Sequence, residues 1–242
     1  MRKYNYGSII LILIVNVIIS GILQNIADGN LSILSGFVAF IFDYIICRGL
    51  LYNREGSFSD YFRGIKTMTG KVFLMNILVG AITVVLLILA ALASGAGFLL
   101  FSDYAIKDTK IVISLIVLFT LVMIFTSLIF AYLNFFMADE RYRDLTFFDS
   151  LKLIVKAGIK LFSESFMAGV KAYKITLLSG VIVLVTGVLA FQTPMAAIIT
   201  FIFALIAAIA LFLCTPPFRA SLSDIYIDRA EEIYNEVIGC ED

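Results

Sequence analysis

Asp43 is the residue whose type and position most favour a chemical role. It lies well inside a long apolar stretch, about 12 Å from the end of that stretch at 1.5 Å of helical rise per residue. Acidic side chains at such a depth are costly in a membrane and often serve a function. Four further polar residues are expected in the same half of the membrane, where they could complete a cavity open to the cytoplasm: Asn16, Asn76, Asn134 and, nearer the surface, Arg48. The alternative is that Asp43 reaches the interface or hydrogen-bonds a neighbouring helix.

A second set of candidate residues is basic. Lys152, Lys156 and Lys160 recur every four residues, opposite an apolar face, which predicts an interfacial amphipathic helix over residues 147–162. Such a face could bind anionic lipid head groups or an acidic partner. It could equally be a solvated face that enforces topology. A third possibility is docking of acidic residues from a helix predicted over 222–238, namely Asp224, Asp228, Glu231, Glu232 and Glu236.

Several chemistries are disfavoured. The sequence has no histidine, which removes the commonest general base and metal ligand. Its three cysteines, Cys47, Cys214 and Cys240, form no Cys-x-x-Cys pair, so neither a zinc site nor a dithiol motif is indicated. A net charge of zero provides no basic field for nucleic acid. We therefore expect no cofactor, no metal, no nucleic-acid partner and no enzymatic activity.

The elements that must position these residues are membrane helices. Of the 242 residues, 62% are hydrophobic and only 15% are charged, and the apolar residues gather in long runs. We predict an all-α, polytopic membrane helix bundle that forms one integral membrane domain over 1–242. The six predicted spans are 7–23, 31–51, 72–100, 111–136, 172–191 and 195–213.

Sidedness follows from the basic residues. Of the 18 Lys and Arg residues, all but Lys107 and Lys110 lie in segments or span ends on one predicted side of the membrane. The positive-inside rule makes that side the cytoplasm. Of the eleven tyrosines, all but Tyr104 lie in or near the same interface. We expect a multi-pass protein of a prokaryotic cytoplasmic membrane, with both termini and residues 57 and 146 inside, and Asp28, Asp103 and Gln192 outside.

A short internal repeat follows spans two and four. Residues 57–63, Ser-Phe-Ser-Asp-Tyr-Phe-Arg, match residues 146–152, Thr-Phe-Phe-Asp-Ser-Leu-Lys. Ser57 and Thr146 are expected to cap helices, with Asp60 and Asp149 reaching back to the free amide of the cap. A weaker third copy occupies 221–224. The chain is thus expected to form three hairpins, each followed by a capped cytoplasmic helix, over 58–69, 147–162 and 222–238.

Small residues at four-residue spacing mark close helix contacts. Ala196, Thr200, Ala204 and Ala208 form one such ladder, and Ala91 with Gly95 repeats the spacing in the third span. These ladders favour packing within the chain, and the alternative is a seam between two copies in a homo-oligomer.

Short motifs also carry a resemblance. The acidic turn at 137–140, the helix start at 146–152, the Thr-Pro-Pro-Phe segment at 215–218 and Asp-Ile-Tyr at 224–226 resemble six-helix prokaryotic membrane proteins of uncharacterised role. These are related to the membrane domain of glycerophosphoryl diester phosphodiesterases. Small membrane proteins encoded beside carbohydrate-uptake genes are a second similar group. Neither resemblance implies a reaction, because phosphodiesterase chemistry in the first group resides in a separate soluble domain.

Two functional hypotheses remain. The leading one is a non-enzymatic scaffold, regulator or accessory subunit that acts through its cytoplasmic amphipathic helices. Its partners would be membrane lipids and a membrane or cytoplasmic protein. The alternative is a transporter or permease for a lipid or small solute, using a polar cavity around Asp43. Polar groups that converge on a cavity would favour transport, whereas a dry bundle would favour scaffolding.

Overall fold

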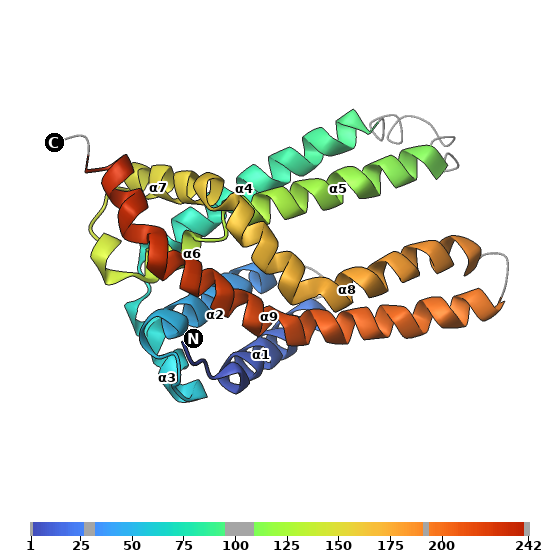
Figure 1. The fold of residues 1–242 in the computed structure, drawn as a ribbon, viewed down its shortest axis with the longest axis horizontal. Coiled ribbons are helices and arrows are strands. Elements are labelled where there is room, and N and C mark those ends of the chain that lie inside the picture. The colour runs from blue at the N-terminus through green and yellow to red at the C-terminus, as the bar shows by residue number, and fades with distance from the viewer. Residues whose placement is uncertain (1, 27–31, 95–108, 191–193, 240–242) are drawn as a thin grey trace. The chain divides into compact units, whose positions relative to one another are not determined.

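The computed structural model describes residues 2–26, 32–94, 109–190 and 194–239 (Figure 1). These described residues form helices and no strand, which confirms the all-α prediction. The α-helices are α1 (Tyr6–Asn25), α2 (Ser32–Tyr52), α3 (Phe58–Phe62), α4 (Gly70–Ala93), α5 (Thr109–Ile129), α6 (Leu133–Ala138), α7 (Phe147–Lys160), α8 (Phe162–Ala190) and α9 (Pro194–Val237), with 3-10 turns at Arg63–Thr67 and Glu140–Tyr142.

Within the described residues, six helical segments are long and apolar enough to cross a membrane, as the sequence predicts. They are Tyr6–Asn25, Leu34–Tyr52, Gly70–Ala93, Ser114–Ala138, Phe162–Gly187 and Pro194–Val237. Many of their large apolar side chains are exposed, as expected of helices that lipid rather than protein covers. Residues 28, 103 and 192, which the sidedness prediction places outside, lie beyond the described residues, as does Cys240.

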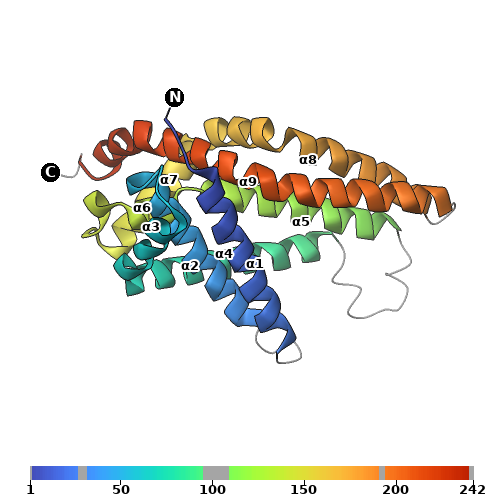
Figure 2. The same cartoon turned by 90° about the horizontal axis from the view of Figure 1, so that it is seen from below.

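The chain divides into two compact units where the sequence predicts one domain. Unit 1 comprises Met1–Met68 and Ser163–Glu231, and unit 2 comprises Thr69–Phe162 and Glu232–Asp242. In unit 1, α1 runs beside α2 and α8 runs beside α9 (Figures 1 and 2). In unit 2, α4 packs on α5, and α7 packs on the end of α5.

The helix predicted over 58–69 is shorter than expected. It is helical only from Phe58 to Phe62 and continues as a 3-10 turn. Tyr61 is fully buried against α2, where a Cβ placed on Gly49 would lie 2.1 Å from the Tyr61 ring. A Cβ on Gly64 would lie 3.2 Å from the Arg48 side chain. The segment therefore folds tightly onto α2 instead of extending as a longer amphipathic helix.

The prediction of two separate helices at 195–213 and 222–238 is wrong. Helix α9 is continuous from Pro194 to Val237 and contains Pro216 and Pro217. Proline lacks the amide that a helix uses, so Pro216 and Pro217 leave the Phe212 and Leu213 carbonyls without their usual donors, while side-chain hydroxyls bond two neighbouring carbonyls. The Thr215 hydroxyl donates to the Leu211 carbonyl at 2.8 Å and the Ser221 hydroxyl to the Pro217 carbonyl at 2.9 Å. The third repeat copy therefore lies inside α9 and begins no helix.

Two other predicted boundaries differ. Helix α8 begins at Phe162, ahead of the predicted span start at 172, and is kinked at Tyr173 (φ −94°, ψ 15°). The predicted span 111–136 is interrupted, since α5 ends at Ile129 and α6 begins at Leu133.

The apolar face of α7 is covered by protein. Leu153, Ile154 and Ala157 are fully buried. A Cβ on Gly158 would lie 1.8 Å from the Ile129 carbonyl oxygen, so only glycine permits this approach of α7 to the end of α5. The apolar face of α7 therefore packs inside unit 2, and the interfacial position of this helix stays a prediction.

Candidate functional site

Asp43 forms an ion pair with Arg219. The Arg219 guanidinium in α9 contacts the Asp43 carboxylate in α2 directly, and both side chains are only 27% exposed. A carboxylate bound to a guanidinium inside an apolar span behaves as a neutral unit, which lowers the cost of placing either charge there. The structure therefore favours the alternative in which Asp43 bonds a neighbouring helix.

The surroundings of this pair bring together α2, α8 and α9 of unit 1. The Tyr173 hydroxyl, at the kink of α8, donates to the Thr215 hydroxyl oxygen at 3.3 Å. The Tyr173 ring packs on that of Phe218 with centroids 5.1 Å apart. The kink of α8 and the two prolines of α9 thus flank the ion pair. Sequence reasoning missed Arg219 because it ended the last span at 213, although a helix pattern continues beyond the prolines.

The other predicted cavity residues have different neighbours. Asn16 accepts a hydrogen bond from Ser20 at 3.4 Å within α1, and the Arg48 guanidinium lies 4.8 Å from the centroid of the Tyr52 ring. Asn76 and Asn134 belong to unit 2, where the Asn76 amide donates to the Asn134 oxygen at 3.1 Å. Asn16 and Arg48 thus share unit 1 with Asp43, whereas Asn76 and Asn134 bond each other in unit 2, and the cavity around Asp43 stays a prediction.

The lysine stripe is partly neutralised by the end of α9. Lys160 lies 2.9 Å from the Glu232 carboxylate and 2.5 Å from that of Glu236. Lys156 approaches Glu236 at 3.7 Å, and Lys152 is exposed. The hydrogen bonds that the Lys160 ammonium donates to Glu236 and Glu232 raise its pKa. Glu232 and Glu236 thus bind the lysines as the docking possibility proposes. Lys156 and Lys160 are therefore less available to anionic lipid.

Asp224 and Asp228 do not join that cluster. Instead the Arg2 guanidinium contacts Asp224 at 2.9 Å and Asp228 at 2.6 Å. The Tyr4 hydroxyl donates to Asp224 at 2.6 Å, and its pKa is raised by burial and by this hydrogen bond. Of the five acids named for the docking possibility, Asp224 and Asp228 instead hold the N-terminal segment against α9.

The predicted caps occupy the starts of α3 and α7. The Ser57 amide and hydroxyl donate to the Asp60 carboxylate at 2.9 and 2.7 Å. The Thr146 hydroxyl accepts from the Asp149 amide at 3.2 Å and donates to the Asp149 carboxylate at 2.5 Å. The carboxylates thus sit at the first turns of both helices, where the helix dipole favours negative charge.

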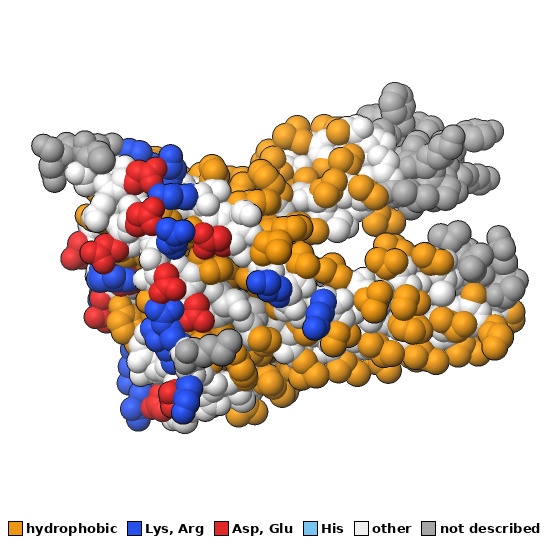
Figure 3. Space-filling model, in the orientation of Figure 1, with side chains coloured by type: hydrophobic (Ala, Val, Ile, Leu, Met, Phe, Trp, Pro, Cys, Tyr) orange, Lys and Arg blue, Asp and Glu red, His pale blue; other side chains and the backbone are white. Residues whose placement is uncertain are grey.

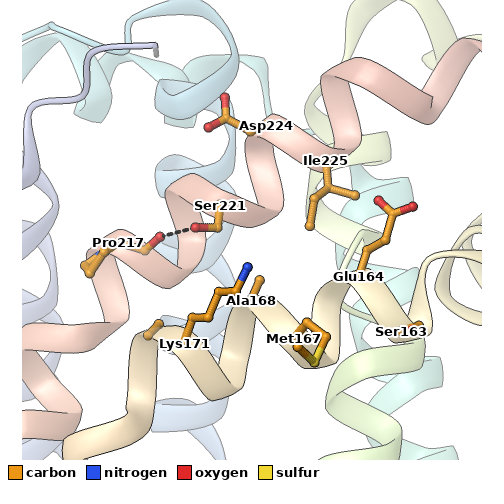
Figure 4. Close-up of a pocket in the computed structure, with 10 residues that line it drawn as sticks. Ser163, Glu164, Met167, Ala168, Lys171, Pro217, Ser221, Asp224 and Ile225 are labelled. Carbon is orange, nitrogen blue, oxygen red and sulfur yellow. Dashed lines mark hydrogen bonds between the residues drawn. The ribbon is translucent and has the colours of Figure 1, made fainter.

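A cleft opens between the first part of α8 and the middle of α9 (Figure 4). Its volume is about 690 Å³. Its lining combines small and apolar side chains with charged and hydroxyl groups: Ser163, Glu164, Met167, Ala168, Lys171, Ala172, Pro217, Ser221, Asp224 and Ile225. Figure 4 shows Lys171 reaching from α8 toward α9, with Glu164 nearer the start of the same helix. Sequence reasoning missed this site because it assigned no element to residues 163–171.

No group of three or more Cys, Asp or Glu side chains that could hold a metal ion occurs among the described residues. Comparison of the chain with protein-family models, with curated proteins and with solved structures found no match.

Proposed function

We propose that this chain is a non-enzymatic membrane protein that acts as a scaffold, regulator or accessory subunit. In this role it would present the helical segments outside its spans to a membrane or cytoplasmic protein. The observation that carries the proposal is the pairing of Asp43 with Arg219. A substrate-binding acid must be available to water or a cation, whereas a carboxylate closed on a guanidinium joins two helices.

The surface most suited to a partner is the first turn of α7. Phe148 is 77% exposed there, beside the Thr146 cap, while the opposite face of the helix is buried in unit 2. An exposed aromatic ring on a rigidly held helix is a frequent anchor of protein interfaces. We therefore assign Phe148 as the anchor of the partner-binding surface.

We also propose that the termini, α3 and α7 face the cytoplasm, because of the distribution of Lys and Arg. Single cysteines at residues 57 and 146, in a chain with Cys47, Cys214 and Cys240 replaced by serine, would test this sidedness in intact cells. A membrane-impermeant maleimide should label neither position until the membrane is opened. Labelling of either position in intact cells would contradict the proposed orientation.

The second candidate function is transport, and one observation favours it. The kink at Tyr173 and the prolines at 216 and 217 flank an intramembrane charge pair. Irregular helices beside charged groups are typical of transporter substrate sites. In that case the pair would open during turnover and its charges would bind the substrate.

Substitutions that remove the charges of Asp43 and Arg219 but keep the size of both side chains distinguish scaffolding from transport. The double variant Asp43→Asn/Arg219→Gln should insert and complement a deletion strain at normal abundance if the pair is structural. Phe148→Ser should lose complementation, and the matched control Ile159→Ser, at another exposed apolar position of α7, should retain it. A double variant that is abundant but inactive would contradict the scaffold proposal and favour transport.

A further inference from the structure

The cleft between α8 and α9 contains one charged side chain without a protein partner among the described residues. The Glu164 carboxylate accepts from the Arg229 guanidinium at 3.3 Å, and Asp224 is held by Arg2 and Tyr4. Lys171 has no such bond, and its ammonium extends into the space between the two helices (Figure 4). Because Arg2 also bonds Asp228, these charges balance in sum, and the Lys171 ammonium is the group of the lining that can bind an anion.

The position of Lys171 along α8 indicates where that anion would lie. From Ile175 onward the helix is apolar, and many of its side chains are exposed: Ile175, Leu177, Leu178, Val181, Leu184 and Val185. On the α8–α9 hairpin, hydrophobic side chains cover the part toward the connection between the two helices (Figure 3). Lys171 therefore lies at the polar border of an apolar span, the level at which lipid head groups lie in a bilayer.

We propose that this cleft binds the phosphate group of a membrane phospholipid, with the Lys171 ammonium donating to the phosphate oxygens. The acyl chains of the lipid would lie along the exposed apolar surface of α8 and α9. A volume of about 690 Å³ falls within the usual range of small-molecule sites and accommodates a head group. The site is independent of the partner surface on α7.

The size of the expected effect follows from the chemistry of the contact. A charge-assisted hydrogen bond to a phosphate contributes enough that its removal weakens binding about tenfold. Lys174 provides a matched control, because it lies one turn along the same helix and does not line the cleft. If anionic lipid were attracted only by the general positive charge of α8, loss of Lys171 and loss of Lys174 would weaken binding equally.

The test is native mass spectrometry of the detergent-purified full chain, titrated with phosphatidylglycerol in mixed micelles and, in a parallel arm, with glycerol 3-phosphate. Lys171→Gln should weaken binding of the first phosphatidylglycerol molecule about tenfold. Lys171→Arg should retain it, and Lys174→Gln should bind within about twofold of the wild type. Circular dichroism and gel filtration establish that each variant is folded.

Equal losses in Lys171→Gln and Lys174→Gln, or no loss in Lys171→Gln, would overturn the site. Binding of glycerol 3-phosphate as tight as that of the lipid, and competitive with it, would assign the cleft to a soluble phosphate ester and overturn the lipid assignment. A folded Lys171→Arg variant that loses binding as completely as Lys171→Gln would also contradict the proposal, because it retains the charge.

Discussion

The two units stabilise polar groups within their spans in different ways. Unit 1 joins α2 to α9 with a charged pair, Asp43 and Arg219, whereas unit 2 joins α4 to α6 with an amide pair, Asn76 and Asn134. An amide that loses its partner remains neutral, but a charge that loses its partner must be solvated or neutralised. The charged pair therefore penalises a wrong helix arrangement far more than the amide pair does.

The units also use one helix-start motif with different outcomes. After Ser57 the helix ends within a few residues and continues as a 3-10 turn, whereas after Thr146 it extends to Lys160. The equivalent positions differ: Ile65 is 38% exposed, while Ile154 is fully buried. A cap thus fixes where a helix begins, and burial of its apolar face determines how far it extends.

The largest expected effect in this comparison comes from Asp43→Ala. It leaves Arg219 without its carboxylate partner in a span, and we expect a loss of about 2–3 kcal/mol in the free energy of unfolding. Unfolding in a denaturing detergent, followed by circular dichroism, measures this loss. A variant as stable as the wild type would show that Arg219 reaches water without Asp43.

The corresponding change in unit 2 should be milder. Asn134→Ala removes a neutral acceptor from Asn76, whose amide still donates to the Val72 carbonyl at 2.9 Å. We expect a loss of about 1–2 kcal/mol in the same unfolding assay. Asn16→Ala, in α1, is the control and should change stability least. A larger loss for Asn134→Ala than for Asp43→Ala would reverse the ranking of the two units.

Thr146→Ala should cost about 1 kcal/mol of local stability, because the Asp149 amide loses its acceptor. Hydrogen exchange in the first turn of α7 is the direct measurement. Protection should fall there and remain unchanged at the C-terminal end of α7. Unchanged protection at Asp149 would show that the buried face alone holds the start of this helix.

The smallest effect is a pH dependence at the start of α3. Hydrogen bonds from the Ser57 hydroxyl and amide lower the pKa of the Asp60 carboxyl. Because the pKa of Asp60 is lowered on folding, the charged carboxylate stabilises the folded turn at pH values above the ordinary aspartate pKa of about 4. This stabilisation is lost as the pH falls through the pKa of Asp60 in the folded protein. Carboxyl carbon shifts in labelled protein should therefore titrate below pH 4 in the wild type and closer to it in Ser57→Gly. Identical titrations would contradict the capping role of Ser57.

The apolar helices were the predictable part of this fold, because the length and composition of a run determine whether it can cross a membrane. The helix starts at Ser57 and Thr146 follow from local hydrogen bonding and were equally accessible. The continuity of α9 was not predictable in this way, because whether a helix continues through Pro216 and Pro217 depends on the packing around it. The partner of Asp43 was missed for the same reason, since Arg219 lies beyond these prolines.

The Lys171 cleft could not be predicted from the sequence for a different reason. It exists because residues 163–172 continue the helix of the span and lie beside the middle of α9. No periodicity in that segment distinguishes a cleft from a solvated face. The neutralisation of Glu164 by Arg229 likewise depends on a contact between residues far apart in the sequence.

We infer that the polar groups within the spans hold helices together, and a double-mutant cycle on Asp43 and Arg219 tests this most directly. The cycle compares the unfolding free energies of Asp43→Asn, Arg219→Gln and the double variant with that of the wild type. We predict a coupling energy of about 2 kcal/mol. The double variant should therefore lose about 2 kcal/mol less stability than the sum of the losses in the two single variants. Additive losses, with no coupling between the two positions, would contradict the claim.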